Sequence, residues 1–547
     1  MNSAPDVTRL SDGGAVLSAC FDTFKATVYV PANDKPDDVL NYGYIAPYLL
    51  IFAPGDFSYD EAVNFAKENG FERLAADFAS SVVFIYPSSG SWKDASADIF
   101  AEILSNSAIH QYYKDGYVKR FNRFTKQIDD YRIRGAIFRT NLFGFGESAD
   151  YIALNCLNHF EGDGLWGRAD SAPVTCILSD LSVMPKVDAD DIPVISVGNS
   201  AEINDLLRSK VKYLLIKDKP DYYCDHYEFA HKFRRMLGQL ELDPDLEAEG
   251  LVTEPGIETV MTSADNRGDD KGTTEHRIGY FAFYNEGLFD KGPAPLLLAF
   301  HGGGDSAFYI SHISGWAKIA YRHNFLLVAI ENHLNSTATE MTALIDALRK
   351  KYSIDPTRIY CSGFSMGGCK SWDMIGEYPN VLAAAAPMDA TFEVGLNSYG
   401  EPSAMPLNTT VPVPVFYSGG EITPLPELPF QAQKCIDRIK YVLELNKTGK
   451  VYDVKLDEKD SWENKIWGIN GDQRVITHDE SRNADLTIEL FETDGRCLVA
   501  LSSVSGQGHE CREHTCENAW RYMSNFRRLP DGTIEGGDLE AIRGCFI

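Results

Sequence analysis

The segment Gly-Phe-Ser-Met-Gly at 363–367 contains the residues best suited to chemistry. It follows the apolar run Ile359–Cys361, which predicts a short buried strand, and it precedes a segment with Trp372 and Ile375 that is typical of a helix. A serine between two glycines at such a turn is typical of a nucleophile, because the glycines let strand and helix approach closely. The free N–H groups at the start of the helix point back toward Ser365. These features predict that Ser365 attacks a carbonyl carbon.

A second glycine-rich segment, His301-Gly302-Gly303-Gly304, follows the apolar run Leu296–Phe300. Alone it would indicate an ordinary glycine turn beside a packed histidine. It lies about 60 residues before the serine, however, with a predicted strand and helix between them. Main-chain N–H groups in such a loop can bind an oxyanion together with the N–H after the nucleophile. We therefore expect Gly303, Gly304 and Met366 to form an oxyanion hole.

A base must remove the proton from the serine hydroxyl. His509 follows Ser-Gly-Gln-Gly at 505–508, a flexible loop between a strand-like run, Arg496–Val504, and a predicted helix. The order serine, acid, histidine along the chain would place the base on this last strand–loop–helix unit. We predict that His509 is the base, with His514 as the alternative.

The acid that orients this histidine should follow the strand Val413–Tyr417. The hexapeptide at 419–424, Gly-Gly-Glu-Ile-Thr-Pro, contains a single carboxylate, which is Glu421. Asp389, which follows the predicted strand Ala383–Ala386, is the alternative acid. Either carboxylate can hold an imidazole in the required orientation.

Four residues with zinc-ligand side chains cluster near the C-terminus, in the order His509, Cys511, His514 and Cys516. A structural zinc site normally has paired cysteines, a long spacer and paired histidines, and this order lacks that layout. We predict no metal site here, and the serine chemistry needs no cofactor.

The composition excludes several classes of partner. The chain has 547 residues and a formal charge of −28, so that binding to nucleic acid or to an anionic membrane surface is disfavoured. It has no apolar run of 18 residues, and its start shows no signal peptide. The 11 scattered cysteines predict reduced thiols and a cytoplasmic location, although a chain from which a leader had been removed would look the same. A homo-oligomer is left open.

The length and the order of elements predict two tandem domains. Apolar runs typical of buried parallel strands, such as Tyr48–Ala53, alternate with helical patterns, which predicts a mostly parallel sheet with helices on both faces. The order begins again after an acidic, proline-containing stretch. We predict α/β domains over 1–245 and 257–547, a linker over 246–256, and an insertion in the second domain at about 435–497.

Four matches in the same order indicate an internal duplication. The matched pairs are Leu49–Asp56 with Leu297–Asp305, Gly144–Gly146 with Gly363–Ser365, Pro193–Gly198 with Pro414–Gly419, and Phe233–Met236 with Phe526–Leu529. In the first copy Gly146 stands where Ser365 stands in the second, and Pro54 lacks the N–H that an oxyanion hole needs. Ser148 is a less suitable nucleophile, because no glycine follows it two residues later. We predict that the first domain is degenerate.

The second half, from about Ile257 to Leu529, resembles the α/β-hydrolase family of feruloyl esterases, polyhydroxybutyrate depolymerases and related predicted peptidases. The matching segments are His301–Gly304, Asp355–Tyr360 running into Gly363–Gly368, and Gly506–His509. The resemblance implies that Ser365 is the nucleophile and His509 the base. It also exposes a departure, because the frame in which the family carries its aspartate falls on Thr423 here. Either Glu421 replaces that aspartate from a shifted position, or the triad is weakened. The first half resembles the same fold only faintly.

We therefore predict a serine hydrolase of the carboxylesterase class (EC 3.1.1), acting on a small-molecule ester through an acyl-serine intermediate. A serine peptidase of the same fold is the enzymatic alternative. A pseudo-hydrolase pair that serves for binding or scaffolding is the non-enzymatic alternative. The insertion, with Trp462 and Trp467, either covers the acyl pocket or is a surface excursion with two packed tryptophans.

Overall fold

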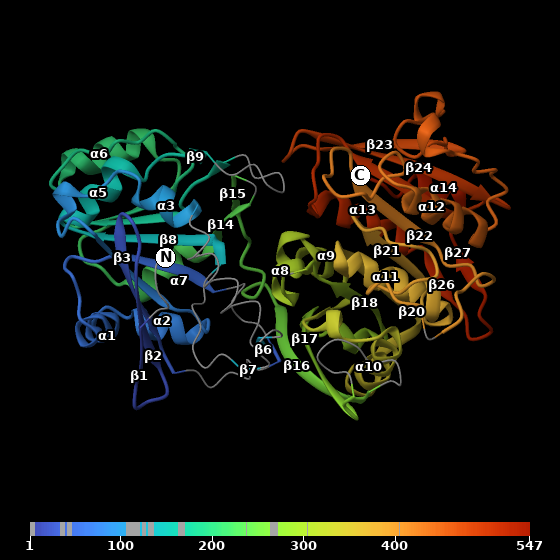
Figure 1. Ribbon diagram of the computed structural model, residues 1–547, viewed down its shortest axis with the longest axis horizontal. Coiled ribbons are helices and arrows are strands. Elements are labelled where there is room, and N and C mark those ends of the chain that lie inside the picture. Colours follow the sequence, from blue (N-terminus) through green and yellow to red (C-terminus); the bar gives the residue numbers. More distant parts are fainter. Residues whose placement is uncertain are drawn as a thin grey trace. The chain divides into compact units, whose positions relative to one another are not determined.

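The computed structural model describes residues 6–32, 39–40, 46–105, 121–122, 127–128, 136–161, 170–236, 238–262, 272–303, 305–403 and 405–547. The chain divides into two compact units, Met1–Asp245 and Leu246–Ile547 (Figure 1). Each unit is built around one large sheet, and the two are described separately.

The first unit contains a nine-stranded sheet. In their order across the sheet the strands are β1 (Asp6–Arg9), β2 (Ala15–Cys20), β3 (Phe24–Val30), β5 (Val82–Pro87), β4 (Pro47–Phe52), β8 (Ala136–Phe145), β11 (Thr175–Ser179), β12 (Val194–Val197) and β13 (Leu214–Lys217). The strands from β5 to β13 are parallel, and β1 to β3 are antiparallel. Every residue of β4 is buried, as its continuous apolar run predicts.

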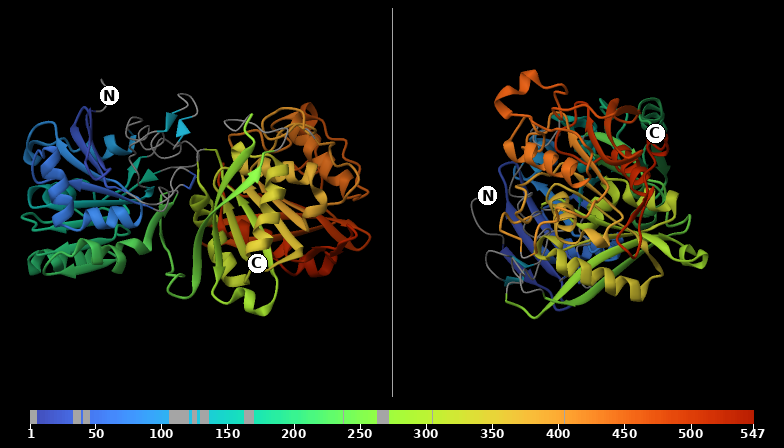
Figure 2. Two further views of the ribbon diagram at one scale, coloured as in Figure 1. Left: turned by 90° about the horizontal axis from the view of Figure 1, so that it is seen from below. Right: turned by 90° about the vertical axis from the view of Figure 1, so that its right-hand side faces the viewer.

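Helices cover both faces of this sheet (Figure 2). One face packs against α1 (Tyr59–Glu68), α2 (Phe71–Asp77) and α7 (Tyr222–Glu228), and the other against α3 (Ile99–Ser105), α5 (Glu147–Asn155) and α6 (Ala201–Lys210). Three strand pairs lie outside the sheet: β6 (Phe121–Asn122) with β7 (Gln127–Ile128), β9 (Phe160–Glu161) with β10 (Asp170–Ser171), and β14 (Phe233–Met236) with β15 (Gln239–Leu242). The two apolar layers, one on each face, form the core of the unit.

The second unit contains a ten-stranded sheet. In their order across the sheet the strands are β16 (Leu251–Met261), β17 (Glu275–Asn285), β19 (Leu326–Ile330), β18 (Ala294–Phe300), β20 (Ile354–Phe364), β21 (Ala384–Met388), β22 (Val415–Gly420), β25 (Arg496–Val504), β24 (Ala484–Thr493) and β23 (Gln473–Asp479). The strands from β19 to β25 are parallel, and the two strands at each end are antiparallel.

Helices again cover both faces. One face carries α8 (Ala307–Ile313), α9 (Trp316–His323) and α13 (Glu513–Met523), and the other α10 (Ala338–Lys351), α11 (Met366–Glu377) and α12 (Gln433–Leu445). Shorter elements are β26 (Phe526–Arg528), β27 (Ile534–Gly536), α14 (Leu539–Arg543) and the 3₁₀ turns η1 (Trp92–Asp94), η3 (Ala230–Lys232), η5 (Leu288–Lys291), η6 (His333–Asn335), η7 (Pro379–Val381) and η8 (Leu456–Ser461). None of the helices in the described ranges has both the length and the apolarity needed to cross a bilayer.

The two sheets have the same strand order. Strands β3, β5, β4, β8, β11, β12 and β13 of the first unit correspond to β17, β19, β18, β20, β21, β22 and β25 of the second. The expectation of two tandem α/β domains, each with a mostly parallel sheet between helices, is confirmed.

One buried arginine in each unit makes three equivalent hydrogen bonds to main-chain carbonyl groups, and Arg235 also pairs with the Asp191 carboxylate over 2.9 Å. Arg235 in the β14–β15 hairpin and Arg528 in the β26–β27 hairpin each donate to their own hairpin turn and to two carbonyl groups ahead of neighbouring strands. The acceptors are Gly238, Pro173 and Asp191 for Arg235, and Gly532, Leu382 and Pro412 for Arg528. This likeness supports an internal duplication.

Strand β16 begins earlier than the sequence indicates. Residues Leu251–Gly256, assigned from the sequence to a linker, pair with β17 as the first half of β16. A proline lies in this stretch at Pro255, and it is tolerated because β16 is the edge strand of the sheet. Acidic composition and a proline therefore do not mark a linker here.

The insertion at 435–497 extends the sheet. It supplies most of α12 and the hairpin β23–β24, which pairs with β25 and so places β25 inside the sheet. Trp462 and Trp467 are 8% and 1% exposed and belong to the core under the sheet. The two tryptophans are thus packed core residues.

Candidate active site

Ser365 lies at the tip of the turn between β20 and α11. Its backbone has φ 54° and ψ −120°, a conformation that few residues other than glycine adopt. A Cβ atom at Gly363 would lie 2.2 Å from the carbonyl oxygen of Gly367, and one at Gly367 would lie 2.1 Å from that of Phe300. Only glycine fits these two positions, so the sequence Gly-x-Ser-x-Gly produces the tight turn and leaves Ser365 half-exposed at its tip.

The loop after β18 approaches the start of α11. A Cβ atom at Gly303 would lie 2.7 Å from Sδ of Met366, so these two residues are direct neighbours. The third expected oxyanion residue, Gly304, lies outside the described residues. His301 fixes the loop, because its ring nitrogens lie 2.7 and 2.6 Å from two main-chain carbonyl oxygens. Burial lowers the pKa of His301, and the neutral ring donates to one of these two carbonyl oxygens at a time.

His509 lies in the loop between β25 and α13. Its Nδ1 atom is 2.9 Å from Oε1 of Glu427, and its ring centre is 4.6 Å from that of Phe364, the residue before Ser365. Burial lowers the pKa of His509, and the nearby carboxylates of Asp389 and Asp305 oppose that change. The imidazole is therefore neutral at neutral pH, which is the form that can accept a proton.

Glu427, which the sequence reading missed, lies in the loop after β22. The Thr423 hydroxyl donates to its Oε2 over 2.7 Å, and Gln431 Oε1 accepts the main-chain N–H of Glu427 over 3.0 Å. The side chain is 4% exposed, and burial raises its pKa to about 8. One signal could have identified it: Glu427 is the single charged residue in Pro-Leu-Pro-Glu-Leu-Pro-Phe at 424–430, where a carboxylate must be enclosed by apolar groups.

Glu421, the acid expected from the sequence, contacts a different group. It is exposed, and its Oε2 accepts the main-chain N–H of Gly506 over 2.9 Å. Glu421 directly follows β22, and its own N–H still donates to Val504 of the neighbouring strand. It therefore remains at the end of the sheet, whereas the six further residues of the loop bring Glu427 to His509.

Asp389, the alternative acid, directly follows β21 and has φ 44°. Its Oδ1 accepts the main-chain N–H of Gly420 over 2.7 Å. One oxygen of Asp389, one of Glu427 and one ring nitrogen of His509 all lie within 4.8 Å of one another. Burial raises the pKa of Asp389 well above its usual value, and the charge of Glu427 raises it further. Two buried carboxyl groups thus face one imidazole.

Within the described ranges, these three side chains are the only ones grouped closely enough to hold a metal ion. The remaining residues of the C-terminal histidine–cysteine cluster do not converge on them. Cys511 Sγ lies 3.4 Å from Cys516 Sγ, whereas His514 Nε2 lies 2.8 Å from the Thr477 hydroxyl. All eleven cysteines are free thiols.

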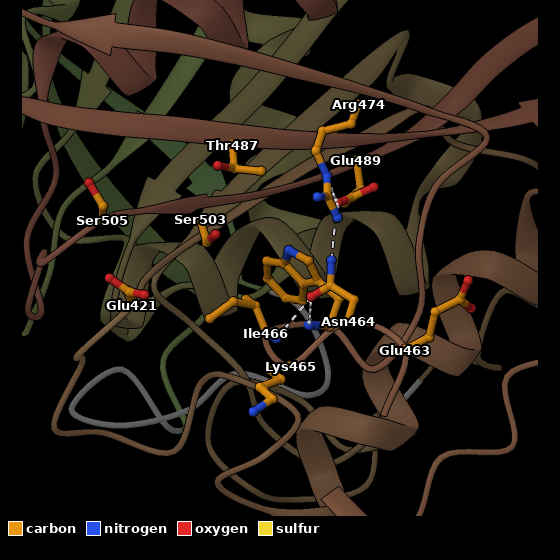
Figure 3. A pocket seen from close by; sticks show the side chains of 11 residues that line it. Glu421, Glu463, Asn464, Lys465, Ile466, Arg474, Thr487, Glu489, Ser503 and Ser505 are labelled. Carbon is orange, nitrogen blue, oxygen red and sulfur yellow. Dashed lines mark hydrogen bonds and ion pairs between the residues drawn. The ribbon is translucent and has the colours of Figure 1, made fainter. Parts of the chain in front are cut away.

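A cavity of about 330 Å³ lies beside the loop that carries His509 (Figure 3). It is lined by Glu421, Glu463, Asn464, Lys465, Ile466, Trp467, Arg474, Thr487, Glu489, Ser503 and Ser505. Buried Glu489 is paired with Arg474, whose Nε donates to it over 2.6 Å (Figure 3). The insertion therefore forms one wall of a cavity whose lining is both polar and apolar.

Comparison with known proteins gives two curated relatives. Over 136 residues the chain is 29% identical to a bifunctional acetylxylan esterase/xylanase of Neocallimastix patriciarum, with 23% of this chain and 19% of the relative covered. Over 114 residues it is 30% identical to poly(3-hydroxyalkanoate) depolymerase C of Paucimonas lemoignei, with 17% of this chain and 27% of the relative covered. The chain thus spans only about a fifth to a quarter of the length of these relatives. No protein-family model matches it.

Solved structures with similar folds include an acetyl xylan esterase from Aspergillus awamori. It is 12% identical to this chain with a TM-score of 0.31, and the match covers 47% of this chain and 94% of the esterase. A thermostable esterase is 20% identical with a TM-score of 0.26, and 42% and 61% of the two chains are covered. The order of the parallel strands, the strand–serine–helix turn after β20 and the two curated relatives carry the assignment. On this evidence the second unit, Leu246–Ile547, has an α/β-hydrolase fold.

Proposed function

We propose that the second unit is a serine esterase that hydrolyses carboxylic esters through an acyl-serine intermediate. One observation carries the proposal: Nδ1 of the neutral, buried His509 lies 2.9 Å from the buried carboxyl group of Glu427. The His509 ring also packs against Phe364, the residue before Ser365. A nucleophile, a base and an orienting acid are thereby supplied by three different loops at one edge of the sheet.

In the acylation step, His509 Nε2 takes the proton of the Ser365 hydroxyl as Oγ attacks the ester carbonyl. The imidazolium that forms is stabilised by Glu427 at Nδ1, and its proton then passes to the leaving alcohol. In the second step, water attacks the acyl-serine, and the same histidine accepts and returns a proton. Glu427 takes the role that the sequence indicated for Glu421.

The negative charge on the carbonyl oxygen requires donors that are already in place. We assign this role to the main-chain N–H groups of Gly303 and Met366, which are neighbours at the end of β18 and the start of α11. The positive end of the α11 dipole adds to the stabilisation, because Ser365 is the residue that caps this helix. Gly304 stays a prediction.

The substrate class follows from the names of the relatives and from the site. Both curated relatives are named for the hydrolysis of esters, one an acetylxylan and the other a poly(3-hydroxyalkanoate). The proposed mechanism needs only an acyl group and a leaving alcohol. We place catalysis in the second unit alone, because Gly146 occupies the serine position in the first and Ser148 is buried, donating to Phe52 O over 2.6 Å.

A fluorophosphonate probe tests the proposal, since it labels an activated serine covalently. We expect stoichiometric labelling of the wild type, none of Ser365→Ala, and unchanged labelling of the matched control Ser148→Ala. Labelling that persists in Ser365→Ala, or no labelling of the folded wild type, would remove the esterase assignment. Turnover of p-nitrophenyl acetate and methyl ferulate, compared with a short peptide amide, then separates an esterase from a peptidase.

A further inference from the structure

Asp389 is a buried carboxyl group at the active site that the mechanism above does not use. It is 2% exposed and Glu427 is 4% exposed, and the two carboxyl groups lie within 4.8 Å of each other and of the His509 ring. Two negative charges at this separation in a buried site repel each other strongly, so that such pairs retain a proton. This proton can be carried by either Asp389 or Glu427.

The hydrogen bonds to Asp389 distinguish its two oxygens. Oδ1 accepts a short bond, 2.7 Å, from the N–H of Gly420. Oδ2 has only long contacts, 3.3 Å from the N–H of Glu510 and 3.4 Å from the side-chain amide of Gln507. The weakly bonded oxygen is the one that can carry a hydrogen without losing a strong acceptor contact.

Both oxygens of Glu427, in contrast, face donors. Oε2 accepts the Thr423 hydroxyl over 2.7 Å, and Oε1 lies 2.9 Å from Nδ1 of His509. An ionised carboxylate can accept from both the Thr423 hydroxyl and an Nδ1–H of His509. We propose that Asp389 is a positioning residue: its carboxyl group keeps a proton and donates it to Glu427, so that the single negative charge of the pair stays opposite His509. This inference rests on the proposed function.

The other titratable groups around the pair leave this charge arrangement intact. Lys434, at the start of α12, lowers the pKa of Glu427, and Asp305 acts on His509 from the loop after β18. The Tyr417 phenol in β22 and the Cys435 thiol in α12 have raised pKa values, that of Cys435 about 12, because both are buried, and they stay neutral. Lys434 thus favours the ionised form of Glu427, and neither Tyr417 nor Cys435 adds a charge beside the pair.

The pair should determine how activity depends on pH. Glu427 must be ionised to stabilise the imidazolium, and its pKa is raised to about 8. Activity should therefore be low below pH 8 and should rise as pH passes through about 8. A neutral His509 alone would place the rise below pH 6.5, because burial lowers its pKa.

Asp389→Asn and Asp389→Ala, assayed as kcat/KM from pH 5.5 to 10 with p-nitrophenyl acetate, test the inference. The amide of Asp389→Asn still donates a hydrogen to Glu427, so we expect kcat/KM within about 5-fold of wild type and a rise at nearly the same pH. Asp389→Ala removes the donor, so kcat/KM should fall about 30-fold and the rise should move about one pH unit higher. Should Asp389→Ala not fold, Asp389→Gly removes the same group and tolerates the positive φ at this position.

Two results would overturn the inference. A loss in Asp389→Asn as large as in Glu427→Gln would show that Asp389 carries the charge. Equal losses in the Asn and Ala variants, with the rise at the wild-type pH, would show that Asp389 only supports the loop. Labelling by the fluorophosphonate probe separates these results from a failure of the proposed function, which would appear as labelling that survives Ser365→Ala or as no labelling of the folded wild type.

Discussion

The turns at Gly146 and Ser365 have nearly the same backbone. Their φ and ψ angles are 56° and −119° in the first unit and 54° and −120° in the second. In both, the N–H of the residue donates to the end of the next strand, to Ser179 O over 2.9 Å and to Met388 O over 3.0 Å. The first unit keeps the turn without a nucleophile, so the turn is a property of the fold. Glycine adopts this conformation at no steric cost, whereas a serine stores about 1–3 kcal/mol of strain there.

The comparison extends to the acids. Asp180 follows β11 with φ 58°, just as Asp389 follows β21 with φ 44°. The loop after β13, Asp-Lys-Pro-Asp at 218–221, contains no histidine for Asp180 to orient. An aspartate at this corner therefore occurs with and without a histidine beside it, which favours Glu427 over Asp389 as the acid in the proposed mechanism.

The largest expected effect is in the second unit, at the acid. Glu427→Gln removes the charge opposite His509, and we expect kcat/KM to fall by about 10,000-fold. The matched control Glu421→Gln should change kcat/KM by less than about 3-fold, because its contact is with the Gly506 backbone. Steady-state kinetics of both variants decide the assignment, and the reverse order of losses would restore Glu421 as the acid.

The glycine two residues before the tip of the strand–helix turn, Gly363 in the second unit and Gly144 in the first, should be equally intolerant of a side chain in both units. A Cβ atom at Gly363 would lie 2.2 Å from Gly367 O, and one at Gly144 would lie 2.5 Å from Ala149 Cα. We expect Gly363→Ala and Gly144→Ala each to lower the free energy of unfolding of its own unit by about 3 kcal/mol. Hydrogen exchange measured on peptides from each unit reports them separately. No change in the stability of the first unit in Gly144→Ala would mean that its turn can rearrange to accommodate the methyl group.

The two buried arginines should contribute similarly to stability. Arg528→Met and Arg235→Met each leave carbonyl groups without their donor, which we expect to cost about 2 kcal/mol in the unit concerned. The cost should be somewhat larger for Arg235→Met, because Asp191 also loses its charged partner. Urea unfolding measures the loss. The substitution to lysine should recover only part of it, since one ammonium group cannot reach all three acceptors. A cost confined to one unit would contradict the structural equivalence of the hairpins.

The smallest effect should follow from restoring a serine in the first unit. Gly146→Ser has room for its side chain, because nothing lies within 4 Å of a Cβ atom there. We expect a loss of about 1 kcal/mol from backbone strain and no labelling by a fluorophosphonate in a Ser365→Ala background. New labelling would show that the first unit retains a base that its sequence does not reveal.

The sequence predicts the parts of the site that depend on local patterns. The turn at Ser365 and the loop of His509 are each specified by glycines next to a buried strand, and the structure contains both. Glu427 could not be found in this way, because its position depends on the path of the 421–431 loop, which Gln431 holds by contacts along its whole length. The acidic, proline-containing composition of Leu251–Gly256 predicts a linker, whereas these residues form the first half of β16. The sequence does not reveal that β16 is an edge strand, and an edge strand tolerates a proline that a central strand excludes.

The hairpin β23–β24 has a consequence for the position of the base. The strand that leads to His509 is hydrogen-bonded on both sides, whereas β13, its counterpart, borders solvent and none of its residues is fully buried. The hairpin thus stabilises β25, the strand that precedes the His509 loop, by pairing with its second edge. Shortening the chain there would leave Ser365, Glu427 and His509 in the sequence and yet remove the support of the strand that precedes the His509 loop.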